Sequence, residues 1–127
     1  MSDKFEITDL LNQYAVLLDL GRIDECTNLF SETASLELRI GKANGKNEIK
    51  ELLLKILKFT TGKRHFISNT NSQIDGDNAK ASCYLLVIDA TNTPQVVMTG
   101  VYMDELIKEE GIWKIKNRKL LVDPSFK

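Results

Sequence analysis

One histidine and one aspartate are the residues of this chain that could form a general acid–base pair. His65 is the only histidine, and it stands in the segment Arg64-His65-Phe66-Ile67 at the start of an expected strand. Asp19 lies near the end of an expected earlier helix. An imidazole held by a carboxylate can remove or return a proton at neutral pH. If these two side chains meet in an apolar cavity, the sequence predicts a small lyase or isomerase.

Tyr14 is a third candidate, because it lies on the apolar face of the same expected helix as Asp19. Two interpretations of Tyr14 stay open. It could be a core tyrosine whose hydroxyl is satisfied, or a hydrogen-bond donor to a substrate carbonyl that becomes enolate-like. Asp19 places a negative charge at the end of a helix, where the helix dipole disfavours it. Two interpretations of Asp19 therefore stay open as well: a solvated aspartate at a helix end, or a functional carboxylate, which this cost favours.

The elements that would position these residues follow from the spacing of apolar side chains. Helical periodicity runs from Asp3, the expected N-cap, to about Leu20, and Gly21 ends the helix. A short helix over residues 23–30, a strand over 35–40 and a helix over 47–59 are expected next. After them we expect no further helix but four antiparallel strands, at residues 64–74, 79–89, 95–108 and 112–122.

This order predicts one domain over residues 1–127 with an α+β fold. A curved antiparallel sheet would wrap around three N-terminal helices and enclose a cone-shaped cavity. Such a cavity is where a small hydrophobic ligand would bind.

Composition disfavours several other classes of protein. Seventeen basic and eighteen acidic residues nearly cancel, so neither nucleic acid nor a membrane is an expected partner. Cys26 and Cys83 show no metal-type spacing, and we interpret them as buried thiols of a cytoplasmic protein. No metal site is expected from one histidine and two unspaced cysteines, and no cofactor is expected without a glycine-rich phosphate loop or dinucleotide motif.

Several short motifs together resemble the SnoaL-like members of the nuclear transport factor 2-like superfamily, whose fold is also described as a cystatin-like α+β barrel. The resemblance covers nearly the whole chain. It rests on motifs that include Tyr14-x4-Asp19, Arg64-His65, Gly100-x-Tyr102-x-Asp104 and Gly111-x-Trp113-x-Ile115 followed by Arg118. As a functional signature the set is weak, because this fold supports many unrelated activities.

The pattern is most similar to the dehydratase-like branch, which includes scytalone dehydratase and bile acid 7α-dehydratase. The resemblance implies catalytic roles for Tyr14, Asp19 and His65, and substrate contacts for Asp89 and Arg118. In strict alternation with Trp113 and Ile115, Arg118 would face away from the cavity unless a bulge intervenes. Asn69 alternates with His65 and is a further candidate contact. Scytalone dehydratase uses a second histidine that this chain lacks, which argues against the same substrate.

Two alternatives accompany the dehydratase hypothesis. The chain could be a non-catalytic module for ligand binding or dimerisation, with its cavity filled by its own side chains. It could also resemble limonene epoxide hydrolase, with Asp19, Arg118 and Asp89 holding a water molecule. Family analogy also implies a homodimer, for which the last strands offer the apolar residues Val96, Met98, Val101, Met103, Leu120 and Val122.

Overall fold

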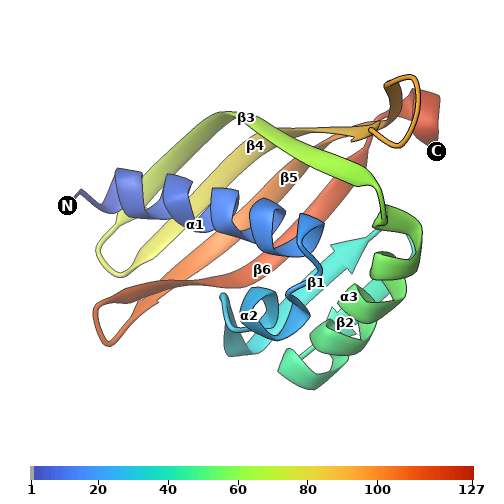
Figure 1. The fold of residues 1–127 in the computed structure, drawn as a ribbon. Coiled ribbons are helices and arrows are strands. Elements are labelled where there is room, and N and C mark those ends of the chain that lie inside the picture. Colours follow the sequence, from blue (N-terminus) through green and yellow to red (C-terminus); the bar gives the residue numbers. More distant parts are fainter. Residues whose placement is uncertain (1) are drawn as a thin grey trace.

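Residues 2–127 are described in a computed structural model, in which helices lie against a curved six-stranded sheet (Figure 1). The elements in chain order are α1 (Asp3–Asp19), α2 (Ile23–Thr27), β1 (Phe30–Leu38), β2 (Gly41–Asn44), α3 (Lys46–Thr60), β3 (Lys63–Asp75), β4 (Asn78–Asp89), β5 (Gln95–Glu109), β6 (Ile112–Val122) and the 3-10 helix η1 (Pro124–Phe126). The predicted α+β class is therefore confirmed. The short η1 lies in the segment where no further helix was expected.

The sheet has the strand order β2-β1-β6-β5-β4-β3. The four long strands β3 to β6 form the expected antiparallel meander. The sheet as a whole is mixed, because β1 pairs with β6 in parallel. This pairing corrects the expectation of a purely antiparallel sheet, and the sequence pattern of β1 could not reveal its direction.

Helix α1 crosses the sheet, α2 lies beside the C-terminal part of α1, and α3 packs against β1 and β2 (Figure 1). The apolar stripe of α1 is fully covered, with Ile7, Leu11 and Leu18 at 0 to 1% exposure. The N-cap is Ser2, whose hydroxyl accepts a hydrogen bond from the Phe5 amide at 3.2 Å. The prediction of Asp3 as N-cap was wrong, because Asp3 is the first helical residue and its carboxylate accepts from the Trp113 indole at 3.0 Å.

The second helix is shorter than expected, because the apolar residues after Thr27 belong to a strand. Phe30 opens β1 and is completely buried, as are Ala34 and Leu36 further along that strand. Strand β2 was missed, since its four residues follow a glycine and carry little alternation. Strand β1 begins five residues and ends two residues before the expected positions, and the remaining predicted boundaries fall within one residue of the observed ones.

Candidate active site

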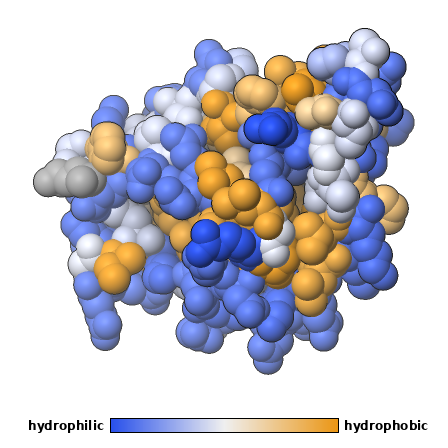
Figure 2. Space-filling view, viewed as in Figure 1, coloured by the Kyte–Doolittle hydropathy of each residue, from blue (hydrophilic) through white to orange (hydrophobic). Residues whose placement is uncertain are grey.

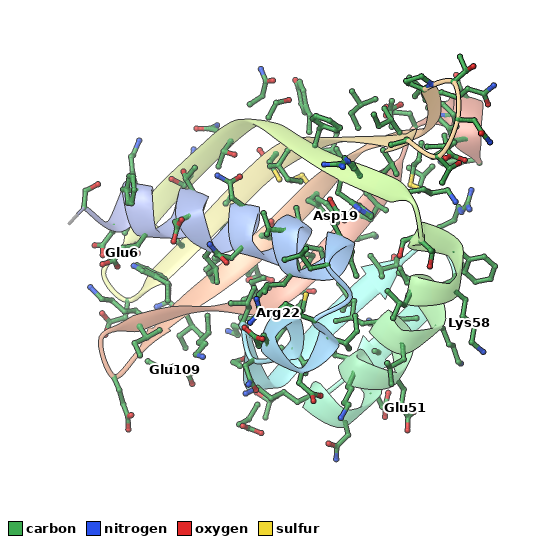
Figure 3. All side chains as sticks on the ribbon, in the orientation of Figure 1. Glu6, Asp19, Arg22, Glu51, Lys58 and Glu109 are labelled. Atoms are coloured by element: carbon green, nitrogen blue, oxygen red, sulfur yellow. The ribbon has the colours of Figure 1, made fainter. Side chains whose placement is uncertain are left out.

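The end of α1 and the start of β3 bring Asp19 and His65 into direct contact. Asp19 Oδ1 lies 2.6 Å from His65 Nδ1, and Asp19 Oδ2 accepts the backbone N–H of His65 at 3.0 Å. Figure 3 shows Asp19 at the end of α1, facing β3. The His65 side chain is only 8% exposed and that of Asp19 is 23% exposed. The carboxylate therefore holds both the ring and the backbone of His65.

This double contact has a chemical consequence for the imidazole. A carboxylate beside Nδ1 favours the tautomer that carries its proton there. Nε2 is then left with its lone pair, the form that a general base requires. The two N–H groups at Asp19 also offset the cost of a negative charge at a helix C-terminus.

His65 lines a cavity of about 460 Å³ between the helices and the concave face of the sheet. The wall is mainly apolar, with contributions from Leu18, Ile56, Leu85, Val87, Val97 and Met98. Hydrophobic side chains also gather between the end of α1 and α3 on the face seen in Figure 2. A cavity of this size and lining suits a small, mostly apolar molecule. The non-catalytic alternative included a cavity filled by the protein's own side chains, and this cavity is not filled in that way.

Two tyrosines, Tyr14 and Tyr102, contribute to the cavity wall. Their rings meet edge to face with centroids 5.9 Å apart. The Tyr14 hydroxyl is buried without a hydrogen-bond partner among the described residues. Burial raises the pKa of Tyr14 well above its ordinary value and raises the pKa of Tyr102 to about 12. Both hydroxyls therefore stay protonated near neutral pH, as hydrogen-bond donors require.

Arg118 lies behind these tyrosines rather than in the cavity wall. Its Nε donates to Asp104 Oδ1 at 2.8 Å and its Nη2 to Oδ2 at 3.2 Å, in a pair whose two side chains are both 0% exposed. The guanidinium carbon lies 3.6 Å from the Tyr102 ring centroid and 4.4 Å from that of Tyr14. Arg118 thus supports the two tyrosines by stacking and charge.

A bulge explains why Arg118 faces inward. Along the β5–β6 ladder, Ile115 pairs with Leu106 but Asn117 pairs with Glu105, so Lys116 is the extra residue. This one-residue insertion returns Arg118 to the interior face. Strict alternation would have turned Arg118 away from the cavity, whereas the bulge turns it inward.

Like Arg118, the other two expected substrate contacts, Asp89 and Asn69, do not line the cavity. The Asp89 carboxylate accepts from the Thr91 backbone at 3.0 Å and hydroxyl at 2.6 Å, and these hydrogen bonds hold the pKa of Asp89 below its ordinary value. Asn69 has a φ of +54° within a register shift between Ser68 and Asn71, and its side chain is exposed. The shift breaks the alternation that linked Asn69 to His65.

The structure does not bring together the three residues of the epoxide-hydrolase-like alternative. Asp19 contacts His65, Arg118 contacts Asp104, and Asp89 contacts Thr91. No role at the site was predicted for Tyr102 or Asp104, although both stand in a motif quoted for the fold. Their inward alternation with Leu106 was the available signal. Within residues 2–127 no three His, Cys, Asp or Glu side chains are grouped to hold a metal ion.

The buried cysteines and tyrosines predict that the protein loses stability in alkali. Burial raises the pKa of Cys83 to about 11 and that of Cys26 to about 12, from a reference of 9.0. Above that reference the unfolded state binds fewer protons than the folded state, so the free energy of unfolding falls as pH rises. Each group contributes a loss of about 1.4 kcal/mol per pH unit between its unfolded and folded pKa. We expect Tm to fall steadily between about pH 9 and about pH 11, and less steeply in Cys83→Ala; a constant Tm would contradict this.

Comparison with known proteins agrees with the fold. The SnoaL-like domain family matches residues 1–119. An uncharacterised protein of Mycobacterium tuberculosis is 28% identical over 123 residues, which cover 93% of this chain and 84% of the relative. No helix among residues 2–127 is long and apolar enough to cross a membrane.

Solved structures give the same architecture. A Nostoc punctiforme protein of unknown function with a cystatin-like fold superposes with a TM-score of 0.92 at 29% identity, covering 97% of this chain and 92% of that one. A scytalone dehydratase candidate from Novosphingobium aromaticivorans superposes with a TM-score of 0.83 at 26% identity, covering 97% of this chain and 89% of that one. This chain belongs to the SnoaL-like domain family.

Proposed function

We propose that this protein is a cofactor-free acid–base enzyme, a lyase or isomerase of the dehydratase type. Its substrate would be a small hydrophobic oxygenated molecule bound in the cavity. The observation that carries the proposal is the 2.6 Å contact between Asp19 and His65 at the wall of an apolar cavity. Similarity to the scytalone dehydratase candidate supports the same reaction class.

In the proposed reaction, Nε2 of His65 removes a proton from a carbon next to a carbonyl group. Tyr14 donates a hydrogen bond to the carbonyl oxygen as negative charge develops on it. The electron pair of the broken C–H bond then forms a carbon–carbon double bond, and a β-hydroxyl group departs. The imidazolium returns its proton to that hydroxyl, so the product is the unsaturated ketone and water. Without a β-hydroxyl, returning the proton to another carbon would give isomerisation instead.

The role of Asp19 can be tested through the tautomer of His65. In Asp19→Asn the amide oxygen is needed to accept the His65 backbone N–H, so the NH₂ group would face Nδ1. Nδ1 would become an acceptor and the proton would move to Nε2, which removes the base. We expect nitrogen chemical shifts of the single imidazole to show the Nδ1–H form in the wild type and the Nε2–H form in Asp19→Asn.

The matched control is Asp9→Asn, which changes an exposed aspartate of the same helix. It should keep the wild-type imidazole spectrum. If Asp19→Asn also keeps that spectrum, Asp19 does not set the tautomer and the pair has no place in the mechanism.

We also propose that the protein forms a homodimer through the outer face of the sheet. Of the apolar residues expected there, Met98 and Leu120 line the cavity instead. The outer face still exposes Phe66, Tyr84, Leu86, Met103 and Leu121, each between 37 and 55%. We expect sedimentation velocity to give a dimer for the wild type and a monomer for Tyr84→Lys. A monomeric wild type at micromolar concentration would contradict the proposal.

A further inference from the structure

The cavity that contains His65 has an uneven charge distribution. Three cationic residues, Arg39, Lys58 and Lys63, line its wall, and no aspartate or glutamate of residues 2–127 does. The three come from separate elements: Arg39 follows β1, Lys58 lies near the end of α3 (Figure 3) and Lys63 opens β3. Segments far apart in the sequence therefore place positive charge at one cavity.

None of the three cations forms an ion pair with a carboxylate of residues 2–127. Lys63 Nζ donates to the Phe59 carbonyl at 2.6 Å, and Arg39 Nη1 donates to the Phe126 carbonyl at 3.4 Å. These carbonyls carry no net charge. They hold the side chains in place without neutralising them.

Three nearby sources of negative charge oppose the positive charge of these three cations. The C-terminal end of α3 carries roughly half a negative charge, which is less than the charges of Lys58 and Lys63 together. Asp89 pairs with Lys63 in the β3–β4 ladder and keeps its negative charge, but it lies outside the cavity wall. Asp19 is bound to His65 and is also absent from the wall. The charged residues that line the wall itself are therefore all cationic.

We propose that the cavity binds an amphipathic anion. Its apolar body would lie among the aliphatic side chains, and an anionic group such as a carboxylate would contact Lys58, Lys63 and Arg39. Lys63 and His65 are two residues apart on one strand, so their side chains leave the same face about 7 Å apart. A molecule anchored at Lys63 would present carbons a few bonds away to His65. The substrate class rests on the proposed function, whereas the binding preference does not.

The test compares two fluorescent probes that share an aromatic body. 1-Anilinonaphthalene-8-sulfonate carries one negative charge and stands in for a carboxylate, and N-phenyl-1-naphthylamine is its neutral counterpart. We expect the wild type to bind the anion at least tenfold more tightly at low salt. The double variant Lys58→Gln/Lys63→Gln should lower affinity for the anion about tenfold, leaving the neutral probe unchanged. Added salt should weaken binding of the anionic probe only.

Lys55→Gln is the matched control, because Lys55 is an exposed lysine of α3 outside the cavity wall. It should bind both probes as the wild type does. The imidazole signal of His65 should shift on addition of either probe, which locates the binding. The proposal would be overturned if the wild type bound the two probes equally tightly, or if the double variant lost affinity for both probes equally. It would also be overturned if neither probe shifted the His65 signal. None of these outcomes bears on the tautomer test of the acid–base function.

Discussion

Asp104→Asn is expected to lower the free energy of unfolding by about 3 to 5 kcal/mol, the usual cost of removing one partner from a buried ion pair. The substitution keeps the side-chain volume but leaves the fully buried Arg118 guanidinium without a counter-charge. Burial opposes the charge on Arg118, and Asp104 outweighs that effect, so the pKa of Arg118 lies above its ordinary value. Without Asp104 the guanidinium still stays protonated, because arginine does not lose its proton in proteins, so the folded state bears the cost. Urea unfolding followed by circular dichroism measures it.

Glu37→Gln provides the matched control for Asp104→Asn. Glu37 pairs with Lys119, the residue next to Arg118, at 3.6 Å, but the two side chains are 39 and 51% exposed. Breaking such a surface pair costs between about 0 and 1 kcal/mol. A loss of similar size in both variants would show that Arg118 and Asp104 are not held as a buried pair.

The placement of this pair is an argument about function as well as stability. A buried ion pair is a poor source of stability, since hydrophobic residues of similar volume often do as well. Here the guanidinium lies against the rings of both Tyr14 and Tyr102, and both tyrosines reach the cavity wall. We infer that Arg118 is a positioning residue that fixes the tyrosine hydroxyls. In the double variant Arg118→Met/Asp104→Leu, an unfolding free energy close to that of the wild type together with altered probe binding would fit this role.

The sequence allowed the long elements to be predicted, because each carries a clear period. The apolar stripe of α1 and the alternation along β4, β5 and β6 placed these elements within about one residue. Strand β2 and the start of β1 were missed, since Gly41–Asn44 is too short for a pattern and Phe30 continues an apparently helical run. Parallel pairing of β1 with β6 joins segments about eighty residues apart and has no local signal.

The site was predictable in so far as it depends on these elements. Asp19 ends a periodic helix and His65 begins a periodic strand, so both positions followed from boundaries that were predicted well. Arg118 and Asn69 depend on local irregularities, an extra residue at Lys116 and a positive φ at Asn69 itself. A single such irregularity inverts the side chains that follow it. For the site residues, side-chain register and not element type therefore limited the prediction.

His65→Gln is expected to reduce general-base catalysis by about 10² to 10⁴-fold, the usual contribution of such a group. A suitable assay is the ring opening of 5-nitrobenzisoxazole, a small neutral aromatic molecule that the cavity can accommodate. The base removes one C–H proton, the N–O bond breaks, and a coloured nitrocyanophenolate is released. Glutamine keeps the size and polarity of histidine but cannot accept the proton. The measurement is the second-order rate constant of the wild type and the variant at pH 7 to 8.

Three comparisons make this result specific to the proposed pair. Asp19→Asn should lose as much activity as His65→Gln, because it moves the imidazole proton onto Nε2 and removes the base without removing the ring. Asp9→Asn should keep the wild-type rate. Free imidazole at the same concentration measures what a base achieves without the cavity. If the wild type is no faster than free imidazole, or if His65→Gln retains its rate, His65 is not a general base and the chain is better described as a binding module of its family.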